Sequence, residues 1–255
     1  MKARISNASA AFFKVAKAQK IKISSVSGGQ LASFIAINPD TLNFVGQETV
    51  RDELFHSSLK YFKDNEHNFF GTIHGNAFFI DAFGSKAFQL INFSKQANQM
   101  DFLLPGCSHR IHEAGRLGCR DLLLGAMIAA FSETQLANWI QDKELVEKAL
   151  LIKKELKQGV VSSKDFRFSL MVLFRLDYVK IMDGLISQKI IPGTINLFMK
   201  TGITNKGMPK VMRTSLPENA FIELIALQDF YIGISSCPGD KKSIPKPSDI
   251  LIEIE

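Results

Sequence analysis

The N-terminal part of the chain carries short apolar runs separated by polar residues and turn formers. Runs of this kind that end at Gly, Asn or Asp predict β-strands joined by turns. The segment from Val15 to Ile23 alternates apolar and polar residues and is followed by Gly28-Gly29, which indicates one extended segment that ends in a turn. Further strands are expected at residues 21–23, 31–37, 69–70, 78–80 and 88–93.

The spacing of the apolar positions changes between Gly118 and about Gln188. There they recur three and four residues apart, the period of amphipathic helices. We expect Gly159 to end the second helix, Ser162-Ser163 to cap a third, and Gly184 to interrupt that helix near its end.

The part of this region from about Ser132 to Lys189 is predicted to be an accessory element. Its exposed face is charged, and its apolar face packs on the rest of the protein or on a second copy. Leu136, Trp139 and Ile140 are the expected members of that apolar face.

Strand signals return after residue 190, with Gly and Pro between them. The expected strands cover residues 195–199, 220–227, 231–234 and 250–254. A helical segment therefore interrupts one β-rich body. The sequence predicts an α+β fold, with a mainly antiparallel β body and a helical insertion at about 132–189, in a single domain over residues 1–255.

Composition narrows the classes of partner. The chain has 255 residues, of which 46% are hydrophobic and 22% charged, which is typical of a globular protein. Its net charge of +6 is spread along the chain without a zinc-finger spacing or an Arg-rich tract, so we expect no nucleic acid partner but allow an anionic small-molecule ligand. The apolar runs are shorter than the roughly 20 residues that span a bilayer, so no membrane partner is expected.

The cysteine count bears on the compartment. Three cysteines cannot all pair within one chain, and we therefore expect free thiols in a reducing compartment, the cytoplasm. The six cations that precede Asp40, the first acidic residue, would also suit a transit peptide. The alternation from Val15 to Ile23 favours a folded strand instead.

Reactive side chains are densest between Pro105 and His112. Cys107, His109 and His112 lie there, and Cys119 follows at the start of a helical pattern. Thiolates and imidazoles are the ligands that zinc prefers. The alternative for each cysteine is a buried structural thiol.

Cys119 has a second interpretation as a nucleophile. A helix N-terminus and the neighbouring Arg120 would both lower its thiol pKa, whereas Asp121 in the first turn would oppose this. His109 or His112 would then act as the base.

Three segments near the C-terminus carry the most specific signal, residues 191–199, 226–230 and 234–240, with Cys237-Pro238 at a strand end. Taken in this order they resemble the urea carboxylase-associated family. The resemblance also includes Gly28-Gly29-Gln30, Thr49, Cys107-Ser108, Cys119-Arg120-Asp121 and Lys246-Pro247.

The resemblance implies a chemistry. Members of this family accompany urea carboxylase and guanidine-degrading enzymes, and some are implied to deiminate carboxylated guanidine. A metal-dependent hydrolase or deiminase acting on a small urea- or guanidine-derived compound is the function it suggests. The three cysteines fall at the family's cysteine positions, and Asn196 and Asp229 at its polar positions.

As a hypothesis, Cys107, Cys119 and Cys237 bind zinc together with His109, and we expect the three sulfurs to lie close together. Asp229 would act as an acid, base or orienting carboxylate, or else as a simple turn residue. Asn196 would donate a hydrogen bond to a polar ligand.

The chain also departs from the family pattern. Ser33 stands where an Asp is expected, Lys86-Ala87 where a His-Asp pair is expected, and Leu122 where an Asn is expected. Ser33, Lys86 and Ala87 favour the alternative, a non-catalytic binding or subunit protein that keeps the family fold but lacks part of the active site. Either function is compatible with a homo- or hetero-oligomer.

Overall fold

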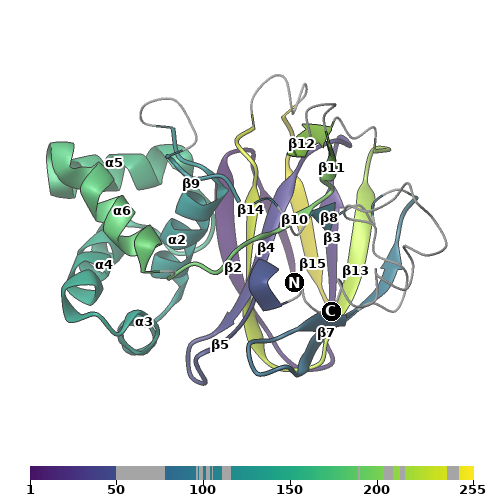
Figure 1. Cartoon of the computed structure of the whole chain (residues 1–255), viewed down its shortest axis with the longest axis horizontal. Coiled ribbons are helices and arrows are strands. Elements are labelled where there is room, and N and C mark those ends of the chain that lie inside the picture. Colours follow the sequence, from purple (N-terminus) through teal and green to yellow (C-terminus); the bar gives the residue numbers. More distant parts are fainter. Residues whose placement is uncertain are drawn as a thin grey trace.

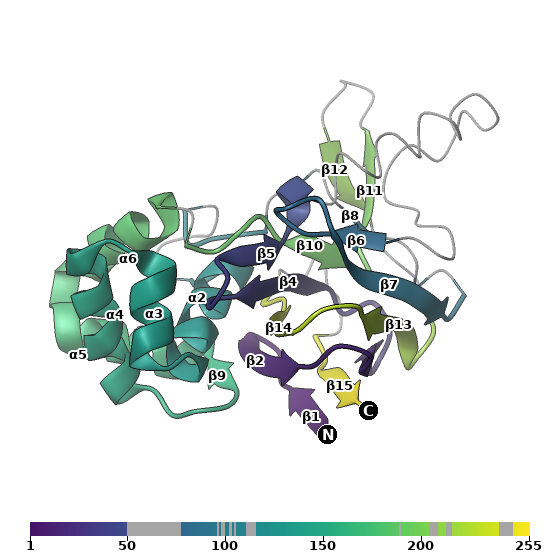
Figure 2. The ribbon, with the colours of Figure 1, turned by 90° about the horizontal axis from the view of Figure 1, so that it is seen from below.

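The computed structural model describes residues 1–49, 78–95, 97, 100–101, 104, 106–110, 116–188, 190–203, 209–212, 216–239 and 247–255. These residues form three layers, two antiparallel sheets stacked face to face and a group of helices on the outer face of the second sheet (Figures 1 and 2). The expected α+β class with a mainly antiparallel β body is confirmed.

The first sheet contains both ends of the chain. Its central strand β3 pairs with β15 and β13, so that Ile23 lies opposite both Ile252 and Ile222. In spatial order its described strands are β1 (Lys2–Ile5), β15 (Ile250–Ile254), β3 (Lys20–Ser25), β13 (Ala220–Ala226), β7 (Lys86–Phe93) and β6 (Phe78–Ile80).

The second sheet is the one that faces the helices. Its central strand β14 pairs with β2 along its whole length and with β4 from Tyr231 to Ser236. In order its described strands are β8 (Met100–Asp101), β10 (Ile195–Leu197), β4 (Ala32–Asn38), β14 (Phe230–Ser236), β2 (Ser9–Val15) and β9 (Val161–Ser162), with β5 (Asn43–Val45) also on β4. β11 (Lys200–Ile203) and β12 (Pro209–Met212) form a separate pair.

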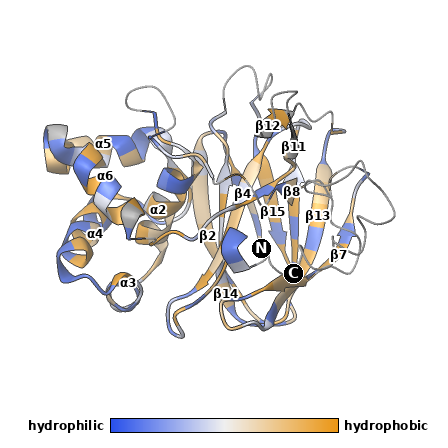
Figure 3. Ribbon diagram, viewed as in Figure 1, coloured by the Kyte–Doolittle hydropathy of each residue, from blue (hydrophilic) through white to orange (hydrophobic). Residues whose placement is uncertain are grey.

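Strand β4 shows why the second sheet is apolar on both faces. Phe34 and Ala36 belong to the core between the sheets, whereas Ile35 and Ile37 belong to the core under the helices. Alternate residues of a strand point to opposite faces, so a strand buried on both sides is a continuous apolar run. Figure 3 shows the strands of the sandwich as mainly hydrophobic, while the helices mix hydrophilic and hydrophobic residues.

The helical layer consists of α2 (Cys119–Ala130), α3 (Glu133–Ile140), α4 (Lys143–Glu155), α5 (Ser163–Phe174), the short 3-10 helix η1 (Arg175–Asp177) and α6 (Tyr178–Ser187). Leu136 and Ile140 are buried in the core under the helices. The Trp139 indole N–H donates to the Ile190 carbonyl at 2.8 Å, and its ring meets Phe44 edge-on at 6.5 Å. The predicted packing of this amphipathic face on the body is confirmed, and its status as an insertion stays a prediction.

Several expected boundaries differ from the structure. Val15 ends β2 and Lys20 begins β3, and the turn between them holds Ala18 at a φ of 71°. The two strands before Lys20, β1 and β2, were not predicted. The third helix breaks at Arg175, whose φ is 49°, and Gly184 lies inside α6 instead of interrupting a helix. The expected strand at residues 69–70 lies outside the described residues.

None of the described helices combines the length and the hydrophobicity needed to cross a membrane.

Candidate metal centre

The three cysteines of the chain meet where the helical layer joins the second sheet. Cys107 lies in the loop before α2, Cys119 is the first residue of α2, and Cys237 follows the last residue of β14. Their Sγ atoms all lie within 4.8 Å of one another. No disulfide joins any two of these three described residues. The predicted convergence of the cysteines is confirmed.

The start of α2 holds the first two cysteines together. The Cys119 backbone N–H donates to the Cys107 Sγ at 3.2 Å, and the Arg120 N–H donates to the Cys107 carbonyl at 3.0 Å. Gly118, the N-cap residue, lies so close to this loop that a Cβ there would sit 2.4 Å from the Cys107 carbonyl oxygen. The loop of Cys107 therefore packs directly on the end of the helix.

Cys237 is fixed by a separate set of hydrogen bonds. Its N–H donates to the Leu31 carbonyl at 3.0 Å, and its carbonyl accepts from the side-chain amides of Gln30 and Asn7, each at 3.0 Å. Gln30 is fully buried and also accepts from the Ser248 N–H at 2.8 Å. The Gly-Gly-Gln turn noticed in the sequence thus positions the third cysteine.

The surroundings disfavour the thiolate forms of Cys119 and Cys237. Hydrogen bonds with the Cys107 and Cys237 thiols, together with burial, hold the pKa of Cys119 well above its usual range. The Cys107 thiol, together with burial, raises the pKa of Cys237 to about 12, although the hydrogen bond with Cys119 acts in the opposite direction. The lowered pKa expected for Cys119 from its helix N-terminus and Arg120 is therefore wrong, because three adjacent thiols in a buried site disfavour a thiolate.

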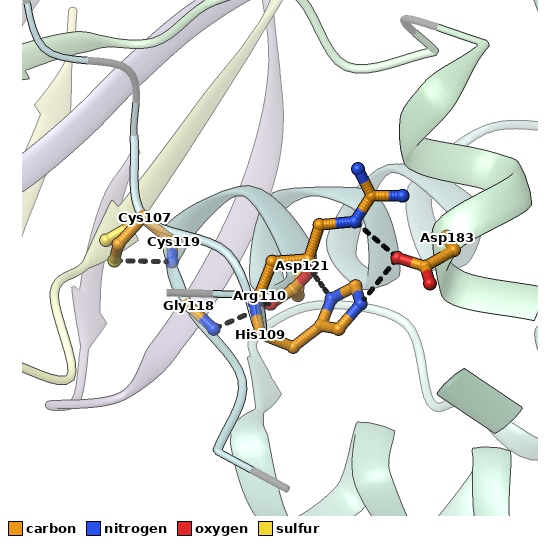
Figure 4. Close-up of polar contacts among 7 residues, drawn as sticks. All are labelled: Cys107, His109, Arg110, Gly118, Cys119, Asp121 and Asp183. Atoms are coloured by element: carbon orange, nitrogen blue, oxygen red, sulfur yellow. Dashed lines mark hydrogen bonds and ion pairs between the residues drawn. The ribbon is translucent and has the colours of Figure 1, made fainter. Parts of the chain in front are cut away.

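His109 does not point toward the cysteines. Its Nδ1 lies 2.9 Å from Asp121 Oδ1, and its Nε2 lies 3.1 Å from Asp183 Oδ1 (Figure 4). Both ring nitrogens are thus occupied by carboxylates, which also raise the pKa of His109, the Asp121 hydrogen bond most of all. This geometry corrects the expected role of His109 as a ligand. His112 lies outside the described residues.

Asn196 is buried and its amide is saturated. Its Oδ1 accepts from the Ser33 and Thr194 hydroxyls, both at 3.1 Å. Its Nδ2 donates to Asp101 Oδ2 at 3.1 Å and to the Leu104 carbonyl at 2.8 Å. The side chain therefore connects β10 to the segment that leads to Cys107. Because all donors and acceptors of the Asn196 amide are used within the protein, none is left for the predicted hydrogen bond to a ligand.

Asp229 lies at the other end of the strand from the cysteines. It precedes the first residue of β14, and Cys237 follows the last, a separation of roughly 26 Å at about 3.3 Å per residue. The Asp229 Oδ1 accepts from the Lys17 N–H at 2.7 Å. Of the two predicted roles, the turn residue is the one that this position supports.

The four residues that depart from the family pattern lie in different parts of the fold. Ser33 lies beside Asn196 in the second sheet. Lys86 and Ala87 lie in β7 of the first sheet, where Lys86 Nζ covers the Phe78 ring at 4.0 Å and Ala87 is buried in the core. Leu122 is buried in α2.

Two carboxylates organise this site, and neither was predicted in that role. Asp121 was expected only to oppose a low Cys119 pKa, and Asp183 was not expected here at all. Asp121 is fully buried, and its Oδ2 accepts from the backbone N–H groups of Gly118 and His109 at 2.7 and 2.6 Å. An acidic residue at the third helical position is a known N-terminal signal, and it could have been used here. Asp183, which lies in α6, had no such signal.

Comparison with solved structures finds similarity to a crystal structure of a DUF1989 family protein from Silicibacter pomeroyi. The TM-score is 0.60 at 14% sequence identity, and the match covers 100% of this chain and 76% of that chain. No protein-family model matches the sequence, and the curated proteins contain no match. At this level of identity the similarity shows a shared fold.

Proposed function

We propose that Cys107, Cys119 and Cys237 together bind one zinc ion. The observation that carries this proposal is the convergence of three sulfurs from three separate elements to within 4.8 Å. Three thiolates suit zinc, and sulfurs around a tetrahedral zinc with bonds near 2.3 Å lie roughly 3.8 Å apart, a small adjustment from the arrangement found. Three thiols that lie side by side without a disulfide, one of them buried and two half-buried, have a simple explanation if a cation compensates their deprotonated forms.

Three protein ligands also fit a site that leaves one position for water or substrate. Structural zinc sites usually have four protein ligands, whereas catalytic sites usually have three. When bound, zinc would polarise a substrate carbonyl or amidine carbon or activate water. We infer on this basis, and on the resemblance to the urea carboxylase-associated family, a hydrolase or deiminase of small urea- or guanidine-derived compounds in a reducing compartment such as the cytoplasm.

The second candidate is a non-catalytic binding or subunit protein built on the same centre. A specific observation favours it, since neither side chain expected to assist catalysis is available. Asn196 has no free amide group, and Asp229 lies at the far end of β14. Among the described residues, His109 is also occupied by two carboxylates. A catalytic base would then have to come from elsewhere.

Elemental analysis of protein purified without chelators tests the metal proposal. We expect about one zinc per chain. Cys119→Ser and Cys237→Ser should each lower that content strongly, because each removes one thiolate. His109→Gln is the matched control and should keep its zinc, since the imidazole faces Asp121 and Asp183. Zinc content that survives both cysteine substitutions would refute the proposal.

Activity is tested separately on the zinc-loaded protein. Ammonia release from carboxylated guanidine and related ureido compounds should depend on Cys119 if the protein is an enzyme. A zinc-loaded protein that binds these compounds without turning them over would select the second candidate.

A further inference from the structure

The outer face of α5 exposes large apolar side chains. Phe168, Met171 and Val172 are 67%, 48% and 53% exposed. They are spaced three and four residues apart and so lie on one side of the helix. The opposite side, with Phe166 and Leu170, is buried in the core under the helices. A surface helix normally carries polar residues on its outer side, so this face indicates a contact with another molecule.

Cations border these apolar side chains. Lys164 and Arg167 are exposed and precede Phe168 by four residues and one residue. Neither forms an ion pair with an acidic side chain within the described part of the chain. The neighbouring Asp165 instead accepts from the Ser162 hydroxyl at 2.7 Å in the helix cap. The border beside Lys164 and Arg167 is therefore basic, whereas the exposed Asp165 lies on the other border, on the side of Val172.

A hollow adjoins the same residues. It has a volume of about 560 Å³ and lies between α5 and the turn that joins β1 to β2. Asn7 and Ser162 line its polar side, and Lys164, Arg167, Phe168 and Met171 line the side of the helix. A hollow of this kind receives a protruding side chain, which a flat lipid surface does not offer.

We propose that this surface, the α5 face (Lys164, Arg167, Phe168, Met171 and Val172), binds an acidic segment of a different protein. The segment would place an apolar side chain against Phe168 and in the hollow, and its carboxylates beside Lys164 and Arg167. A second copy of this chain is a poorer occupant. A symmetric contact through this face would offer the two cations of each copy only one carboxylate from the partner's α5, because Asp165 is the one acidic residue of that helix.

The test uses the full chain and two labelled helical peptides of about 16 residues. Both carry Leu at every third and fourth position. One has Glu at the flanking positions and the other has Lys. Fluorescence anisotropy should show the Glu peptide binding at least about tenfold more tightly than the Lys peptide, with the difference shrinking as salt is added. Phe168→Ser should weaken Glu-peptide binding about tenfold or more.

Charge reversal and matched controls make the result specific. Arg167→Glu should weaken the Glu peptide and strengthen the Lys peptide. Phe83→Ser and Lys95→Glu alter an exposed aromatic and an exposed cation in the first-sheet region, and both variants should bind like the unmodified protein. Circular dichroism of every variant checks that the fold is kept.

Three outcomes would overturn the proposal. The first is failure of the Glu peptide to bind, or equal binding of both peptides. The second is a concentration-dependent dimer that Phe168→Ser abolishes, which would make a second copy the occupant. The third is sedimentation with phosphatidylserine-containing vesicles that Phe168→Ser abolishes, which would make a lipid surface the occupant. Each is independent of the zinc content of the protein.

Discussion

At the scale of single residues, Asp121 joins the two parts of the chain that carry Cys107 and Cys119. Its carboxylate accepts two backbone N–H groups and contacts the His109 ring, although no part of it reaches solvent. A buried carboxylate is tolerated only when its oxygens are hydrogen-bonded, and the N-terminus of a helix adds a favourable field. Asp121 therefore fixes the backbone on either side of the cysteine site, through Gly118 and His109, without contacting the sulfurs.

The pairing of His109 with two carboxylates predicts a pH-dependent contribution to stability. Asp121 first, and then Asp183, raise the pKa of His109 above 6.5. A raised pKa adds stability that is fully present below about pH 6.5, the unfolded-state value, and is lost as the pH rises through the folded-state value. His109→Gln should therefore lower the free energy of unfolding by about 1.5–3 kcal/mol near pH 6, and by less near pH 9.

Urea denaturation of both proteins between pH 5.5 and 9 measures this difference. Subtracting one curve from the other at each pH removes groups that titrate alike in the two proteins. An equal difference at every pH would show that the His109 charge contributes nothing.

At the scale of elements, substitutions of two helical glycines allow the effect of helix propensity on stability to be distinguished from the effect of packing. A Cβ at Gly125 of α2 would lie 2.8 Å from the Phe166 ring of α5, whereas a Cβ at Gly184 of α6 would have its nearest neighbour at 3.7 Å. Ala is favoured over Gly inside a helix by about 0.5–1 kcal/mol. Gly184→Ala should gain that amount, but Gly125→Ala should lose about 0.5–2 kcal/mol net because overpacking costs about 1–3 kcal/mol.

Guanidinium denaturation of the two variants and the unmodified protein gives both values. If Gly125→Ala were as stable as Gly184→Ala, the contact between α2 and α5 would be looser than the structure shows.

The individual strands and helices also show how much of the fold could be predicted from the sequence alone. The long strands β3, β4, β7, β13, β14 and β15 were predictable because apolar runs ending at Gly, Asn or Asp leave few alternatives, whereas the short strands β5, β8, β9, β11 and β12 were not predicted. β2 was missed because its first four residues, Ser9 to Phe12, are buried on both faces and show no alternation. The break at Arg175 was missed because a positive φ at an arginine has no sequence signal.

The sequence could predict which residues gather at the candidate site, but not the direction in which each side chain points. The cysteines were expected at the ends of elements, and such ends can meet in a layered fold. The imidazole of His109 lies two residues from Cys107 and still points to Asp183, because side-chain direction depends on tertiary contacts. The distance of Asp229 from Cys237 was within reach of the sequence, since the segment between them was already expected to be extended.

At the scale of the whole molecule, each of the three cysteines comes from a different part of the fold, and these parts meet at one end of the sandwich. Cys237 belongs to the second sheet, Cys119 to the helical layer, and Cys107 to the loop that Asn196 anchors near β8 and β10. A bound ion would therefore link the helices to the sheet. Such a link forms only in the folded chain, because the three positions are far apart in the unfolded one.

Metal removal should consequently lower the stability of the entire protein. At a free zinc concentration one hundred times the Kd, binding to the folded state adds about 2.7 kcal/mol. For a domain of this size about 1 kcal/mol corresponds to roughly 2–4 °C, so treatment with a chelator should lower the Tm by roughly 5–10 °C.

Cys237→Ser should have the lower Tm from the start and show no further change with chelator. Ser235→Ala is the matched control on the same strand, because its buried hydroxyl has no hydrogen-bond partner within the described residues. That variant should keep the full chelator effect in calorimetry. A chelator effect that persists in Cys237→Ser would mean that the ion binds elsewhere, and the thiol cluster would then be a packing feature of the junction between sheet and helices.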